Sequence, residues 1–305
     1  MCVTKKRRTE DNGQSTPDDN EAATSSQIKS AQVTSTKNAV GDSMKVAKSN
    51  VKGKQVVEKW VGRALSMGVP NLISEFRSLS KWIPDGMTTN SFNENKDKNR
   101  YQDVPCQDKG RVVLNQYWPA AIGEKMTFGE APNQIVVTNM GMKKMAADEP
   151  GINVTTIKMD YSVNGAPTSK QIRHFQWENW PDRGVPMTKF TATNLLSAVR
   201  GSKFPIIVHC SAGIGRTGTI VALAYVQEKM QAGNDCMDMN ELLKELRQQR
   251  PYSIQNEFQY LYLHRVLLAY FLEKYSDRFQ HCLEGEGAVK YQKWCEDYKA
   301  ATGGD

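Results

Sequence analysis

The run from His209 to Gly218 holds residues whose types and spacing suit chemistry on a phosphate ester. It reads His-Cys-Ser-Ala-Gly-Ile-Gly-Arg-Thr-Gly, follows the apolar residues 205–208 and precedes a helical pattern over residues 219–230. We therefore expect Cys210 at the end of a strand, in a glycine-bearing loop that opens a helix. A sulfur nucleophile with an arginine six positions later predicts phosphate monoester hydrolysis through a cysteinyl-phosphate.

Each position in this loop has a physical role in such a reaction. A free thiol has a pKa of about 8.5, so converging backbone N–H groups and a helix N-terminus are needed to hold the thiolate. Arg216 can bind two phosphate oxygens with parallel hydrogen bonds, which a lysine cannot do. The Thr217 hydroxyl can donate to the departing thiolate, and His209 can fix the backbone of Cys210. The predicted phosphate cradle consists of Ser211, Ala212, Gly213, Ile214 and Gly215.

Two other interpretations of the loop are weaker. A buried structural cysteine explains neither the arginine nor the glycines. The glycines at 213, 215 and 218 also fit a dinucleotide-binding fingerprint, which requires a second strand ending in an acidic residue about 20 positions later. Residues 231–240 are polar and form no apolar strand, so a nucleotide-dependent oxidoreductase is disfavoured.

A candidate general acid lies on the run Trp180-Pro181-Asp182-Arg183-Gly184-Val185-Pro186. Prolines and a glycine bracket Asp182, and Trp180 can anchor the loop as a lid that swings as one unit. Asp182 would protonate the leaving oxygen and then deprotonate a water. An Asp in a proline-flanked surface turn is the alternative. We favour the acid because one reaction then explains both this loop and the cysteine loop.

Further candidates precede and follow these loops. Gln255 and Gln259 lie one turn apart at the start of a helical pattern, where either amide can orient a water, although local sequence alone favours two surface residues. Tyr101 can wall a deep slot for a phenyl phosphate, and Asp103 can accept backbone N–H groups of a peptide. A tyrosine in an ordinary loop is an equally good interpretation of the local sequence.

Taken together, these residues resemble a cysteine-based, non-receptor-type protein tyrosine phosphatase. The resemblance runs in family order over roughly residues 55–275, and its motifs are Asn99-Arg100-Tyr101 with Asp103, Gln116-Tyr117-Trp118-Pro119, Trp180-Pro181-Asp182, the loop 209–218, and Gln255 with Gln259. It implies an α/β (mixed α+β) fold, a twisted mixed β-sheet flanked by helices. It also implies that Tyr101 selects phosphotyrosine by depth, Asp182 is the acid, Cys210 the nucleophile, Arg216 the phosphate ligand, and that Gln255 and Gln259 position water.

The chain departs from the family pattern at one place. Arg111-Val112-Val113-Leu114 is followed at once by Asn115-Gln116-Tyr117, whereas family members separate these landmarks by several dozen residues. A family segment is therefore missing near residues 114–116, and we expect an incomplete domain. Strands lost from the sheet would expose backbone edges and apolar faces, and Arg216 would be less well braced. Our hypothesis is a shortened product, either a splice or gene-model variant or a degenerate paralogue.

The 305 residues divide into three predicted parts. Residues 1–54 carry ten Lys and Arg against six Asp and Glu, out of a chain total of 40 against 33, and their polar composition predicts disorder. Residues 55–275 form the predicted phosphatase domain, and residues 276–305 a helical tail with Trp294 and Tyr298 on its apolar face. Other predicted elements are helices over 57–65, 72–79, 239–246 and 261–272, and strands over 134–138, 153–160 and 170–177 with a turn at 164–165.

Composition and residue spacing also limit the cofactors and the cellular compartments that we expect. The six cysteines and four histidines lack metal-ligand spacing, so we expect no metal and no cofactor. No membrane span or signal peptide is evident, and an active thiolate needs a reducing compartment, which predicts the cytoplasm. The patch at residues 5–8 leaves nuclear import open.

The predicted partners are phosphotyrosine-containing proteins, with no nucleic acid; the oligomeric state stays open. Two other functions remain as alternatives: a pseudophosphatase that binds phosphotyrosine peptides without turnover, and a dual-specificity phosphatase, which Tyr101 disfavours because its slot is deep.

Overall fold

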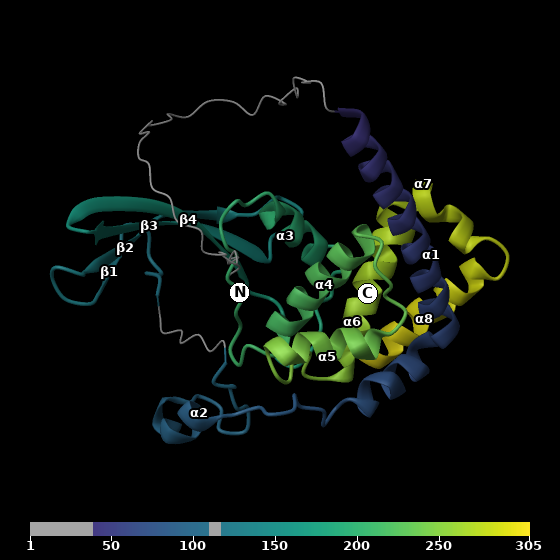
Figure 1. The fold of residues 1–305 in the computed structure, drawn as a ribbon, viewed down its shortest axis with the longest axis horizontal. Helices are drawn as coiled ribbons and strands as arrows, with labels where there is room; N and C mark the ends of the chain where they lie inside the picture. The colour runs from purple at the N-terminus through teal and green to yellow at the C-terminus, as the bar shows by residue number, and fades with distance from the viewer. Residues whose placement is uncertain (1–38, 110–116) are drawn as a thin grey trace.

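The helices and the sheet occupy different sides of the molecule, as Figure 1 shows. The computed structural model describes residues 39–109 and 117–305, with residues 39–50 described as helical backbone only. The predicted α/β class is confirmed: a four-stranded sheet lies beside a body of helices, and the far ends of the long strands extend away from that body (Figure 1). The cysteine loop lies where the sheet meets the helices.

The first helix, α1 (Ala39–Ser78), is broken at Gly68, which has a φ of 64° and precedes Pro70 by two residues. This break matches the two helices predicted before and after Gly68, because a left-handed glycine and a proline interrupt the helical hydrogen bonds. Buried residues along both halves, among them Trp60 and Leu72, face the core.

The sheet is an antiparallel meander in the order β1-β2-β3-β4. Its strands are β1 (Lys125–Phe128), β2 (Ile135–Lys144), β3 (Ile152–Val163) and β4 (Ala166–Trp177). The predicted turn is confirmed: Asn164 and Gly165 both have positive φ, and Val163 pairs with Ala166. Such a two-residue turn matches the twist of the flanking strands. The start of β3 and the end of β4 are buried. Because β4 ends at Trp177, the chain runs from the buried part of the sheet directly into the Asp182 loop.

The helical body is built around α6 (Glu257–Ala269), in which every residue from 259 to 269 is buried. A helix that is covered on all sides belongs to the centre of a core rather than to its surface. α4 (Arg216–Gln231) packs beside it, α5 (Met239–Gln249) packs on α4, and α3 (Thr191–Arg200) follows the Asp182 loop. A π-turn over Tyr270–Lys274 ends α6.

Shorter elements complete the order of the chain. α2 (Asn90–Glu94) and a 3-10 turn over Lys96–Lys98 precede Tyr101, and α7 (Ser276–Phe279) with a 3-10 turn over Gln280–Leu283 leads to α8 (Gly287–Thr302). α8 is the predicted tail helix, and it buries Trp294 and Tyr298 against the body. No helix in the described ranges is long and apolar enough to cross a membrane.

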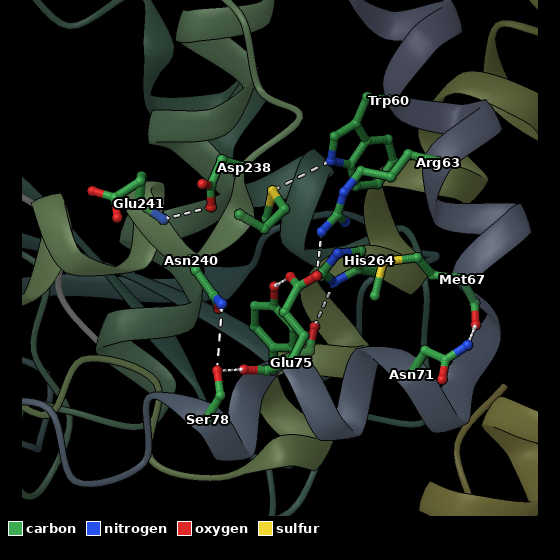
Figure 2. A network of polar contacts seen from close by, with 12 residues as sticks. Trp60, Arg63, Met67, Asn71, Glu75, Ser78, Asp238, Asn240, Glu241 and His264 are labelled. Atoms are coloured by element: carbon green, nitrogen blue, oxygen red, sulfur yellow. Dashed lines mark hydrogen bonds and ion pairs between the residues drawn. The ribbon is translucent and has the colours of Figure 1, made fainter.

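Polar contacts join α1 to α5 and α6, as Figure 2 shows. Glu75 receives hydrogen bonds from Arg63 and from the hydroxyl of Tyr260 on α6. The indole of Trp60 stacks on His264 with 5.4 Å between ring centroids. These contacts fix both halves of α1 against the helix that carries Gln259.

One predicted strand is wrong. Within residues 205–208, only Ile206 forms a β-bridge, so Cys210 follows an extended segment rather than a strand of the sheet. A strand requires hydrogen-bonded neighbours, and the four described strands pair with one another instead. Phe204 and Ile207 are 73% and 43% exposed, so apolar surface stays uncovered at this segment.

The first helix extends past residue 55, the predicted start of the folded domain. α1 already begins at Ala39, upstream of that boundary. Gly53 lies so close to the carbonyl of Met230 that a Cβ there would approach it to 2.9 Å, so α1 is anchored on α4 before residue 55. A helix with an anchored turn extends at little further cost. Residues 1–38, with the basic patch, and residues 110–116, with the departure from the family pattern, lie outside the described residues.

Candidate active site

The loop from Cys210 to Gly215 curls around the cysteine sulfur and leads directly into α4. The backbone N–H of Gly213 donates to Sγ of Cys210 at 3.3 Å. Gly213 has a φ of 72°, which a residue with a Cβ adopts at a cost. α4 begins at Arg216, and Gly215 at its N-cap supplies no side-chain cap. The N–H groups of Arg216 and Thr217, which precede the first helical hydrogen bonds, therefore lie at the loop, the arrangement that binds anions.

The surroundings of Cys210 favour its thiolate. Burial by itself raises the pKa of this thiol, but hydrogen bonding from Thr217 and from Gly213, together with the charge of Arg216, outweighs burial and lowers the pKa below its usual range. The buried Thr217 hydroxyl makes no well-aligned hydrogen bond within the described residues. The Thr217 hydroxyl can rotate toward the sulfur of Cys210 and lower the pKa of the thiol in that orientation. The Gly213 N–H makes a fixed hydrogen bond to the same sulfur.

The lid, residues 180–186, lies against the guanidinium of Arg216. Nη1 of Arg216 donates to the carbonyl of Trp180 and Nη2 to Oδ1 of Asp182, both at 3.4 Å. The Asp182 side chain is 72% exposed, whereas that of Arg216 is 25% exposed. The carboxyl group of the lid thus lies at the mouth of the site, and the guanidinium of Arg216 lies beneath it.

Gln255 and Gln259 lie beside Gly215 on the opposite side of the loop. The side-chain oxygen of Gln259 accepts the backbone N–H of Gln255 at 3.1 Å. Gln259 is only 1% exposed and its amide nitrogen has no hydrogen-bond partner among the described residues, so this donor is available to the site. The interpretation of Gln259 as a helix-surface residue is wrong, because α6 is central and buried.

The segment that follows α2 and contains Tyr101 supplies the other wall of the site. The hydroxyl of Tyr101 and that of Ser211 are 2.8 Å apart, and the guanidinium of Arg100 lies 5.6 Å from the Tyr101 ring centroid. A cavity of 40 Å³ lies between these groups. It is lined by Tyr101, Asp103, Val104, Asp182, Arg183, Cys210, Ser211, Ala212, Gly215, Arg216, Gln255 and Gln259.

Most of the residues predicted from the sequence therefore line one cavity. Gly213, Ile214 and Thr217 do not line it. The carbonyl of Ile214 accepts the N–H groups of Gly218 and Ile254, at 3.2 and 2.9 Å, while its side chain is buried. These residues shape the loop rather than its open face.

Two supporting side chains escaped the sequence analysis. Arg250 donates to the carbonyl of Ala212 at 3.0 Å and to that of Pro105 at 3.2 Å, and so ties the cysteine loop to the segment after Tyr101. The Tyr117 hydroxyl lies 2.6 Å from Nε2 of His209, whose Nδ1 lies 3.4 Å from the Cys210 carbonyl. Burial lowers the pKa of His209, which favours the neutral ring, and the tautomer of that ring decides which of the two groups donates in the contact with Tyr117. The family motifs contain Tyr117, but no local pattern names its partner.

Comparison with known proteins places this site in a family. The family model for protein-tyrosine phosphatase matches residues 114–269, just over half of the chain, and this span includes Asp182, Cys210, Arg216 and both glutamines. The chain belongs to the protein-tyrosine phosphatase family. Among the described residues, no three His, Cys, Asp or Glu side chains cluster as metal ligands would.

Curated members of the family share about a third of the aligned residues. The chain is 32% identical over 177 residues to the human phosphatidylinositol phosphatase PTPRQ, a match that covers 57% of this chain and 7% of that protein. It is 39% identical over 176 residues to the mouse receptor-type tyrosine-protein phosphatase alpha, covering 56% of this chain and 20% of the relative. The chain thus spans a small part of the length of these relatives.

Solved phosphatase structures share the fold. The catalytic domain of human protein tyrosine phosphatase non-receptor type 18 superimposes with a TM-score of 0.55 at 23% identity, covering 67% of this chain and 96% of that one. The Trypanosoma cruzi protein tyrosine phosphatase TcPTP1 gives a TM-score of 0.57 at 18% identity, covering 69% and 94%. At these identities the likeness shows the fold alone.

Proposed function

We propose that this chain hydrolyses phosphotyrosine in proteins through a cysteinyl-phosphate. The observation that carries the proposal is the meeting of Cys210, Arg216 and Asp182 around one cavity, with the thiol pKa lowered. A thiolate, a bidentate phosphate ligand and a carboxyl group at the mouth of the cavity are the three groups that the reaction needs. The exposed rim and the Tyr101 wall favour an aryl phosphate presented by a protein.

In the first step the Cys210 thiolate attacks phosphorus and an S–P bond forms while the P–O bond to the tyrosine breaks. Asp182 transfers its proton to the departing phenol oxygen, which leaves as neutral tyrosine. Arg216 and the loop N–H groups hold the equatorial phosphate oxygens, so the charge that develops in the transition state meets donors already in place.

In the second step water attacks phosphorus and the S–P bond breaks. Asp182, now ionised, takes a proton from the water, and Gln255 and Gln259 orient that water through their amides. Cys210 leaves as the thiolate, which the Gly213 N–H and the neighbouring Thr217 hydroxyl stabilise, and inorganic phosphate is released. No metal and no cofactor enters either step.

Phosphate release from a phosphotyrosine peptide by the purified chain tests the proposal. Cys210→Ser provides the blank, because the hydroxyl occupies the same place but is far less acidic. We expect the wild-type chain to release phosphate and Cys210→Ser to release none. We expect Asp182→Ala to release phosphate roughly 10²–10⁴-fold more slowly, because that is the usual contribution of a general acid. Equal release by wild type and Cys210→Ser would refute the assignment.

A phosphotyrosine-binding protein without turnover is the second candidate. The observation in its favour is the segment before Cys210, which has one β-bridge at Ile206 and leaves Phe204 and Ile207 exposed. A loop held on a loosely paired segment is less well preorganised for catalysis than for binding. Saturable peptide binding that Arg216→Met abolishes, with no phosphate release by wild type, would favour this candidate.

A further inference from the structure

Asn256, the N-cap of α6, lies beside the lid, and its side chain accepts one hydrogen bond and donates another. Its Oδ1 accepts the backbone N–H of Gln259 at 3.0 Å, which caps α6. Its Nδ2 donates to the carbonyl of Arg183 at 2.7 Å. Arg183 directly follows Asp182, so one amide joins the helix that carries the glutamines to the loop that carries the carboxyl group.

The lid needs such a tie, because its backbone is strained at this point. Arg183 has a φ of 59°, in the left-handed region that costs a residue with a Cβ roughly 1 kcal/mol or more. A hydrogen bond made only in this conformation offsets that cost. The Asn256 contact therefore favours the lid conformation in which Asp182 lies by Arg216.

Arg216 contacts Trp180 and Asp182 of the lid, and Asn256 adds the contact to Arg183, while the remaining hydrogen bonds lie within the lid or beyond its end. The indole of Trp180 donates to the carbonyl of Gly184 at 3.0 Å, a bond internal to the lid. The hydroxyl of Tyr262 donates to the carbonyl of Thr188 at 3.0 Å, beyond the end of the lid. The contacts of Asn256 and Tyr262 both come from α6 or its N-cap. They therefore hold the lid and the residues after it against the helix that carries Gln259.

We propose that Asn256 is a positioning residue, a latch that holds the lid closed and thereby places Asp182 over Cys210. This inference rests on the proposed function, in which Asp182 protonates the leaving phenol. When the Nδ2 bond is absent, the closed lid loses one neutral hydrogen bond, which reduces its population by roughly three- to tenfold. The reaction then slows wherever it depends on the proton from Asp182.

Two substitutions remove the latch and keep the cap. Asn256→Asp preserves the capping oxygen at the same reach but has no donor, and Asn256→Ser caps with a shorter neutral side chain. Agreement between the two excludes an effect of the added charge. Asp238→Ala is the control for the loss of a helix cap away from the lid. Asp238 caps α5 by accepting the N–H of Glu241 at 3.0 Å (Figure 2).

The kinetic readout is kcat/KM on two substrates. A phosphotyrosine peptide has a leaving phenol with a pKa of about 10 and needs the proton, whereas an aryl phosphate with a strongly acidic phenol does not. We expect both Asn256 variants to lose about fivefold on the peptide and little on the activated ester. In an Asp182→Asn background the same substitutions should have no further effect. Equal losses on both substrates, or losses that persist without Asp182, would overturn the latch.

A second readout does not require turnover. Trypsin cleaves after arginine where the backbone can extend, so the exposed Arg183 becomes a cleavage site when the lid leaves its closed turn. We expect both Asn256 variants to be cut after Arg183 about fivefold faster than wild type, and Asp238→Ala to be cut at the wild-type rate. Unchanged cleavage in the Asn256 variants would refute the latch. An inactive wild type would instead refute the proposed function, while the cleavage rates still decide the latch.

Discussion

Gly215 offers the sharpest test of the role given to the two glutamines. A Cβ at this position would lie 2.9 Å from Oε1 of Gln255, 2.9 Å from Nε2 of Gln259 and 3.0 Å from Oε1 of Gln259. Ordinary contacts of carbon lie near 3.5–4.0 Å, so Gly215→Ala must push both amides away by roughly 0.5–1 Å. The backbone of Gly215 has a φ of −77°, so no left-handed conformation restricts this position to glycine.

The effect on stability follows from the buried amide. Gln259 is 1% exposed and accepts the N–H of Gln255, so its displacement weakens one hydrogen bond. This costs about 1 kcal/mol of the free energy of unfolding. The effect on catalysis is larger, because a misplacement of about 1 Å in a reacting geometry can cost roughly 10²-fold.

The loss should fall on the second chemical step alone. The glutamines orient the attacking water, so we expect kcat to fall by roughly 10- to 100-fold while kcat/KM, which reports the first step, changes little. Rapid mixing with an aryl phosphate should then show a burst of phenol equal to the enzyme concentration, followed by slow turnover.

Gly62→Ala provides the control for this substitution. A Cβ at Gly62, on α1, meets nothing within 4 Å, so the alanine should leave turnover unchanged and stabilise the helix by about 1 kcal/mol. A parallel fall of kcat and kcat/KM in Gly215→Ala, with no burst, would refute the assignment of the glutamines to the second step.

Three further predictions concern the loop itself. Gly218→Ala should lower the free energy of unfolding by about 1–3 kcal/mol in chemical denaturation, because its Cβ would lie 2.5 Å from the backbone nitrogen of Ile254, which cannot rotate away; unchanged stability would contradict this. Alkylation of Cys210 by iodoacetamide should persist below the ordinary thiol range near pH 8.5 and decline only when the pH falls through its lowered pKa, since the thiolate is the reactive form; an ordinary thiol profile would contradict this. Arg250→Lys should raise KM several-fold, because lysine cannot replace the forked guanidinium that binds the Ala212 carbonyl; an unchanged KM would show that this tie is dispensable.

The sequence predicted best those features that are encoded locally. The Asn164-Gly165 turn, the break at Gly68 and the helix after the cysteine loop each depend on a few adjacent residues. The motifs predict that Cys210, Arg216 and Asp182 lie close together. Cys210 and Arg216 belong to one contiguous loop, and the order of motifs in the family places the lid beside it.

Features that depend on distant partners were not predictable in this way. Whether residues 205–208 form a strand depends on a neighbour elsewhere in the chain, and within this segment only Ile206 forms a β-bridge. Arg250 and Asn256 act on backbone carbonyls of Ala212 and Arg183, and a carbonyl acceptor leaves no trace in the sequence. The burial of Gln259 likewise follows from the central place of α6, which a helical period alone does not reveal.

Trapping the covalent intermediate tests the central claim most directly. The purified chain is mixed with a phosphotyrosine peptide, quenched in acid within the first turnover and digested, and the fragment that contains Cys210 is examined by mass spectrometry. We expect a phosphoryl group on Cys210 that is absent in Cys210→Ser and that accumulates in Gly215→Ala. Phosphate release by the wild-type chain with no phosphorylated Cys210 at any quench time would contradict it.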